Sequence, residues 1–144
     1  MGIKLTNKKA FERYLDQTVE VHLPKYIISE LTKHGNNFIR DARLKEHGSF
    51  TNRTTRLRNS IGYVVAVNGV VNKSDFDSYS VSGVATGEGK ALGLAYATEI
   101  ASTLKGYSLV CVAGADYGLY VEAKGYDVIT GSVLVLKQEL LKKW

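Results

Sequence analysis

The chain has 144 residues, 44% of them hydrophobic, which suits a single domain (residues 1–144) with one hydrophobic core. Its formal net charge is +5, and no apolar run approaches the roughly 20 residues that cross a membrane, so no membrane partner is expected. Cys111 is the only cysteine, which excludes an internal disulfide, and its apolar surroundings predict a buried thiol.

Two helices are expected in the first third of the chain. Apolar residues recur at i, i+3, i+4 and i+7 from Phe11 to Leu23, which indicates an amphipathic helix. Pro24 has no amide donor and disfavours helical geometry in the residue before it, so we expect a break or kink there. The apolar pattern resumes at Ile27, and the second helix is expected over about 25–45.

The centre of the chain is rich in β-branched residues. Ile61–Val67 and the residues after Asn68-Gly69 predict a hairpin, because both positions of its turn need a positive φ. A short strand and a loop are expected over 73–87. The nearly continuous apolar run Tyr107–Ala113 predicts a strand that is covered on both faces.

Helices are expected on either side of this last strand. The helix over 88–104 should end at Gly106 and pack through Gly93, Tyr96, Ala97, Ile100 and Leu104. A short helix is expected over 116–123 and a final one over 132–143. The resulting class is α+β, with helices packed on a small mixed sheet.

Motifs that suggest catalysis fail on inspection. Gly83 to Ala91 resembles a phosphate-binding loop, but five residues separate Gly83 from Gly89-Lys90, and Ala91 replaces the hydroxyl that holds magnesium. The three histidines lack metal-site spacing. Asp75, Asp77 and Glu88 are read as solvated loop acids. We therefore predict no enzyme, no cofactor and no metal; activity abolished by a Cys111 substitution would revive an enzyme hypothesis.

The positive charge is concentrated in one segment. Between Lys33 and Arg58 seven basic residues stand against two acidic ones, so this segment alone accounts for the net charge of +5. Such a cluster can neutralise several phosphates and bind nucleic acid in a salt-sensitive way. No aromatic residue is interleaved with Arg53, Arg56 and Arg58, so a base-stacking platform is not evident. A small nucleic-acid-binding protein is the alternative function.

Two short motifs carry a family resemblance. Thr55-Arg56-Leu57-Arg58-Asn59-Ser60-Ile61 precedes the first strand, and Ala115-Asp116-Tyr117-Gly118-Leu119-Tyr120-Val121-Glu122 follows the last one. In this order the pair resembles the head–tail junction proteins of long-tailed bacteriophages, also called tail-completion, neck or minor tail proteins, and the extension to Ile129 looks like the version in phages of Bacteroidetes-type hosts. Arg56 stands where the family usually has Gly, and Gly118 where it has Ala.

The resemblance implies a structural virion protein, made in the host cytoplasm. It would form or complete a ring between the portal-connector stack and the tail, through which double-stranded DNA passes without sequence recognition. Its implied partners are other copies of this chain and other neck and tail proteins. Thr55, Leu57 and Ser60 would form the motif turn. The residues expected at the interface are Arg53, Arg56, Arg58, Tyr117, Tyr120, Glu122, Tyr126 and Asp127, since Tyr and Arg are enriched at interface cores.

Overall fold

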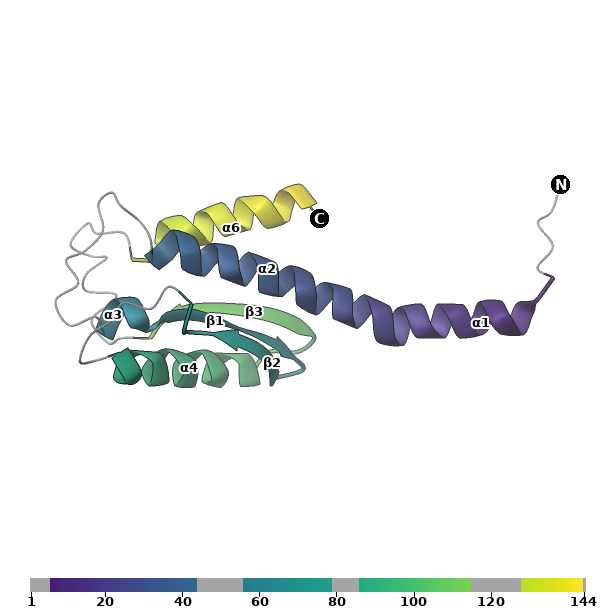
Figure 1. Cartoon of the computed structure of the whole chain (residues 1–144), viewed down its shortest axis with the longest axis horizontal. Helices are drawn as coiled ribbons and strands as arrows, with labels where there is room; N and C mark the ends of the chain where they lie inside the picture. The colour runs from purple at the N-terminus through teal and green to yellow at the C-terminus, as the bar shows by residue number, and fades with distance from the viewer. Residues whose placement is uncertain (1–5, 44–55, 79–85, 115–127, 144) are drawn as a thin grey trace.

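The computed structural model describes residues 6–43, 56–78, 86–114 and 128–143. A three-stranded sheet lies between α4 on one face and α2 on the other, and α6 packs along α2 (Figure 1), so the α+β class is confirmed. The elements are α1 (Lys8–Gln17), the π-helical turn η1 (Thr18–His22), α2 (Leu23–Arg43), α3 (Arg56–Asn59), β1 (Ile61–Val67), β2 (Val70–Asp75), α4 (Thr86–Ser102), β3 (Tyr107–Ala113) and α6 (Thr130–Lys143).

The described strands pair in the order β2-β1-β3, and both pairings are antiparallel, so the expected mixed sheet is corrected to an antiparallel one. The hairpin is confirmed, with φ of 50° at Asn68 and 82° at Gly69. β2 and β3 run in the same direction but never meet, because β3 returns after α4 to the other edge of β1.

The central strand divides the core into two clusters. Side chains alternate between the faces of a strand, so Tyr63 and Val65 pack toward α2 and α6, whereas Val64 and Ala66 pack toward α4. The first cluster also contains Phe38 of α2. Residues 61–66 are all buried, which explains why this run reads as continuously apolar.

The N-terminal helices form one long rod rather than two separate helices. At Pro24 the expected interruption takes the form of a π turn, in which the amide of Leu23 donates to the carbonyl of Thr18. Proline cannot donate to the carbonyl four residues before it, and a wider turn removes the clash of its ring with that carbonyl. The chain therefore stays helical from Lys8 to Arg43.

The buried face of α4 differs from the expected one. Gly89, Gly93, Ala97 and Ala101 form an i, i+4 row that is buried, whereas Tyr96 is exposed. A Cβ on Gly93 would lie 2.4 Å from the carbonyl oxygen of Ser60, so this row lets the helix approach the sheet closely. The helix ends before Gly106, which instead exchanges hydrogen bonds with Asn68 of the hairpin turn.

Candidate functional site

The motif turn before the first strand is a compact structural element. Leu57 lies in α3 and Ser60 directly follows this helix, and both residues are fully buried. The Ser60 hydroxyl donates to the carbonyl of Leu57 at 2.7 Å, and the Ser60 amide donates to the carbonyl of Arg56 at 3.0 Å. The apolar residue and the hydroxyl of the motif therefore close the turn that starts β1. Thr55 lies outside the described residues.

The residues on either side of the second motif are described. Gly114, the last described residue before it, donates its amide to the carbonyl of Ser60 at 3.2 Å. Val128, the first described residue after it, is buried in the same core cluster as Leu57. Gly114 therefore lies beside the motif turn, and Val128 belongs to the core between the sheet and α2. The predicted interface residues Tyr117, Tyr120, Glu122, Tyr126 and Asp127 lie outside the described residues.

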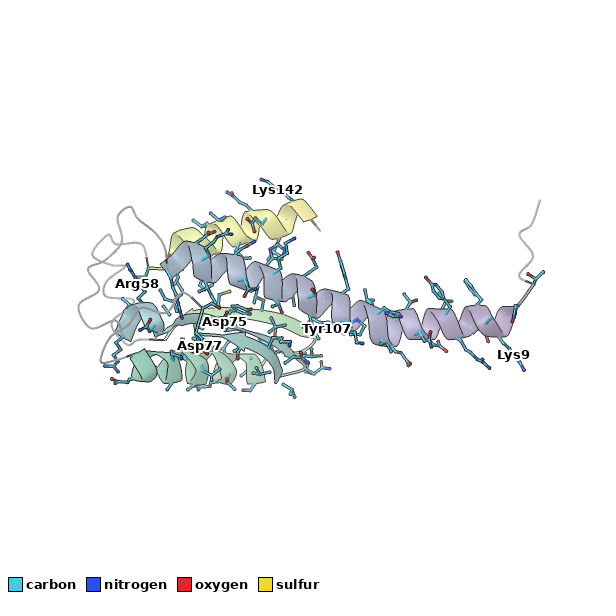
Figure 2. All side chains as sticks on the ribbon, in the orientation of Figure 1. Lys9, Arg58, Asp75, Asp77, Tyr107 and Lys142 are labelled. Atoms are coloured by element: carbon cyan, nitrogen blue, oxygen red, sulfur yellow. The ribbon has the colours of Figure 1, made fainter. Side chains whose placement is uncertain are left out.

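Of the three predicted interface arginines, two are described. Arg56 lies 3.3 Å from Glu88 at the start of α4, so this cation already has an acidic neighbour within the chain. Arg58 extends from α3 at the end of the sheet (Figure 2) and is half-buried. Arg53 lies outside the described residues.

One cation of the basic segment has a structural role that the sequence did not reveal. Arg43 is 1% exposed, and its guanidinium donates to the carbonyls of Ile61, Phe76 and Ser78. Burial lowers the pKa of Arg43 to about 10, although Asp75 acts in the opposite direction. This side chain ties the end of α2 to the start of β1 and the residues after β2, so it is not available to phosphates.

The acids and glycines that suggested chemistry also have structural partners. Asp75 accepts hydrogen bonds from the amides of Asp77 and Ser78, and Asp77 pairs with Lys90. A Cβ on Gly89 would lie 2.5 Å from the carbonyl oxygen of Arg56, so this glycine permits contact between α3 and α4. Gly89 of the stretch that resembles a phosphate-binding loop therefore has a packing explanation.

The thiol of Cys111 and the buried histidine carry no reactive arrangement. Burial raises the pKa of Cys111 to about 12, so its thiol stays protonated near neutral pH. His34 is buried between α2 and α6, where its Nδ1 lies 3.5 Å from a carboxylate oxygen of Glu139. Among the described residues, no group of three His, Cys, Asp or Glu side chains is placed to hold a metal ion.

The feature that sequence reasoning missed is the exposure of the first helix. α1 and η1 project beyond the sheet (Figure 1), and neither contains a buried residue. We call residues 8–26 the arm. Its large apolar residues are exposed to solvent: Phe11, Tyr14, Leu15, Val19, Val21, Leu23 and Tyr26. The amphipathic spacing was visible in the sequence, but the residues from Ile27 onward already supply the face that covers the sheet.

Comparisons with protein-family models, with curated proteins and with solved structures found no match to this chain. In the part of the chain that the structure describes, no helix has the length and apolar character needed to cross a membrane.

Proposed function

We propose that this chain is a structural protein of the head–tail junction of a long-tailed bacteriophage. It forms or completes a ring between the portal-connector stack and the tail, and DNA passes through this ring without being read. It acts by assembly with other copies and with neighbouring neck and tail proteins, and it ends up in the virion.

The observation that carries the proposal is the arm. Seven large apolar side chains on a projecting helix are unfavourable in a lone soluble molecule, and apolar surface of this kind marks contact sites. The paired sequence motifs add the phage assignment. A subunit whose arm is not covered by the described chain suits an assembly role better than catalysis.

The alternative, nucleic-acid binding through Lys33–Arg58, has less support. Arg43 is committed to backbone carbonyls, and the side chain of Arg56 is 30% exposed and lies beside Glu88. A phosphate-binding surface needs several cations that are free to meet the backbone of the nucleic acid. Absence of binding to DNA and RNA at low salt would exclude this alternative.

Deletion of the gene in a phage that carries it tests the proposal directly. Electron microscopy of the lysate should show DNA-filled heads and finished tails that have not joined, and supply of the protein from a plasmid should restore joined particles. Intact, infectious virions from the deletion would refute the role in head–tail joining.

A further inference from the structure

The arm presents a continuous apolar stripe. Phe11, Leu15, Val19 and Leu23 follow one another at i, i+4 spacing, with Tyr14 and Tyr26 beside them. Tyr14 is 65% exposed and Val19 is 59% exposed. In an α-helix such a row drifts around the axis by about 40° per step, because four residues exceed one turn of 3.6 residues.

The π turn η1 corrects this drift. It spans Thr18–His22, in the middle of the row, and its i to i+5 hydrogen bonding means that four residues fall short of a full rotation. The side chains before and after the turn are thereby kept on one side of the helix. A stripe that runs parallel to the arm is the shape needed to lie along another helix.

A second uncovered apolar face lies on α6. Leu134 and Leu141 are seven residues apart, on the same side of the helix, and are 56% and 71% exposed. The neighbouring charges on this helix are mostly basic: Lys137 and Lys142 are exposed, and the acid Glu139 lies against His34. Figure 2 shows Lys142 on the side of α6 that faces away from α2.

The two faces have complementary flanks. Glu12, Asp16 and Glu20 follow one another at i, i+4 and i+8 along one flank of the apolar stripe. Within α1, Lys8 forms an ion pair with this acidic row: its Nζ lies 3.8 Å from a carboxylate oxygen of Glu12, at the N-terminal end of the arm. The middle of the arm is therefore apolar with an acidic border, whereas the exposed leucines of α6 have a lysine on each side, Lys137 on one and Lys142 on the other, so the two faces carry opposite charges at their borders.

The arm cannot reach α6 of its own chain. The helix is continuous from Lys8 to Arg43, and α6 packs on α2 beside the sheet, while the arm points away from it (Figure 1). At 1.5 Å per residue the arm extends about 28 Å, long enough to cover α6 of another molecule. Contact between the two faces therefore requires a second copy.

We propose that the arm of one copy docks along the outer face of α6 of the next copy. The stripe covers Leu134 and Leu141, and the acidic flank meets Lys137 or Lys142, according to the direction in which the arm lies along α6. Because the two surfaces differ, the contact is heterologous and each copy can both give and receive an arm. This inference deepens the proposed function. The contact between two copies does not depend on that function, whereas the closure of many copies into a ring does.

The apolar area agrees with a stable contact. With about 150–250 Å² for each aromatic side chain, the exposed parts of the six residues in and beside the stripe add up to roughly 600 Å². The exposed leucines and valines of α6 add roughly 300 Å² at the usual areas of such side chains. The two apolar surfaces together come to roughly 900 Å², so with the charged borders the contact reaches about the 1,000 Å² at the lower limit of biological interfaces.

The test uses two single variants of the full-length chain and one matched control. Val19→Glu places a charge in the stripe, and Leu141→Glu places one on α6. Val21→Glu makes the same change as the first variant two residues further on, at an exposed position on the other side of the arm. Circular dichroism establishes that all three fold, and analytical ultracentrifugation measures their assembly.

Wild type and Val21→Glu should assemble in a concentration-dependent way, whereas Val19→Glu and Leu141→Glu should each weaken the contact by at least about 100-fold. Mixing these two variants should give a one-to-one dimer that grows no further, because one supplies an intact arm and the other an intact α6. Assembly of Leu141→Glu alone, or a mixture that stays monomeric, would overturn the proposal, as would a wild type that is monomeric at its highest soluble concentration.

The outcome is separable from the phage assignment. Variants that assemble as expected in a chain that plays no part in head–tail joining would refute the proposed function and leave this contact in place. Gene deletion that separates heads from tails, together with Leu141→Glu protein that still self-assembles, would refute the contact and leave the function.

Discussion

Replacement of Arg43 by methionine tests the central structural claim about the basic segment. The guanidinium makes well-formed hydrogen bonds to three carbonyls: 2.9 Å from Nε to Ile61, 2.6 Å to Ser78 and 3.0 Å to Phe76. Methionine has a similar volume and no donor, so the substitution removes these bonds without opening a large cavity. It leaves buried carbonyls that have lost their charged partner.

The expected loss follows from two opposing terms. Hydrogen bonds from a charged donor contribute about 1.5–3 kcal/mol each, so three of them represent roughly 5–9 kcal/mol. Removal of the cation also relieves the cost of its burial, the same cost that lowers the pKa of Arg43. We expect a net destabilisation of about 3–5 kcal/mol, which corresponds to a fall in melting temperature of roughly 10–15 °C for a chain of this size.

Thermal and urea unfolding followed by circular dichroism measure this loss. Arg40→Met is the matched control: the same substitution three residues earlier, at an exposed arginine whose loss should cost less than about 0.5 kcal/mol. Arg43→Lys should lie close to Arg43→Met, because a single ammonium cannot reach carbonyls in several directions. Equal melting temperatures for Arg43→Met and Arg40→Met would refute the assignment of Arg43 as a structural tie.

Three further predictions concern packing, pH and assembly. Gly35→Ala should lower stability by about 1–3 kcal/mol in urea unfolding, because its Cβ would lie 2.6 Å from ring carbons of Tyr63; a neutral effect would contradict this contact. Burial raises the pKa of Tyr63 from 10.0 and of Cys111 from 9.0 to about 12, so the folded state keeps both protons longer than the unfolded state. That stability is fully present below about pH 9 and is lost as the pH rises toward 12. The lowered pKa of Arg43 acts in the opposite direction above about pH 10, one group against two, so thermal melts from pH 9 to 12 should show a net fall; stability that rises over this range would oppose it. Charge reversal at Arg56 and Arg58 together should block the joining of heads to tails in a complemented phage lysate, and normal infectious particles would show that these arginines are dispensable.

Several elements were predictable because their signals are local. The Asn68-Gly69 turn requires positive φ at both positions, and few other residue pairs meet that demand. The strand Tyr107–Ala113 was predicted with the bounds that it has in the structure, since its apolar run is short and nearly continuous. The expectation that it is covered on both faces was wrong: β3 is an edge strand of the described sheet, Tyr107 is exposed, and only Val110 and Val112 are buried. The buried state of Leu57 explains why an apolar residue stands inside a basic motif.

Other features depend on contacts between distant parts of the chain. Arg43 looked like one more cation of a basic helix end, but the carbonyls that it binds lie between 18 and 35 residues away in sequence. The small-residue row of α4 and the exposure of Tyr96 follow from where the sheet and α3 approach that helix. Spacing alone shows that a helix has an apolar face, and it does not show what covers that face.

The arm is the clearest case of this division. The sequence by itself determined that residues 11–23 form an amphipathic helix, that Pro24 disturbs it, and that a β hairpin and a further apolar strand build the α+β core. Only the tertiary structure decided that the sheet ends beneath α2, so that the apolar face of the arm has nothing from the described chain to cover it. The physical reason is that periodicity is set by backbone geometry within one element, whereas burial is set by which other elements lie within reach.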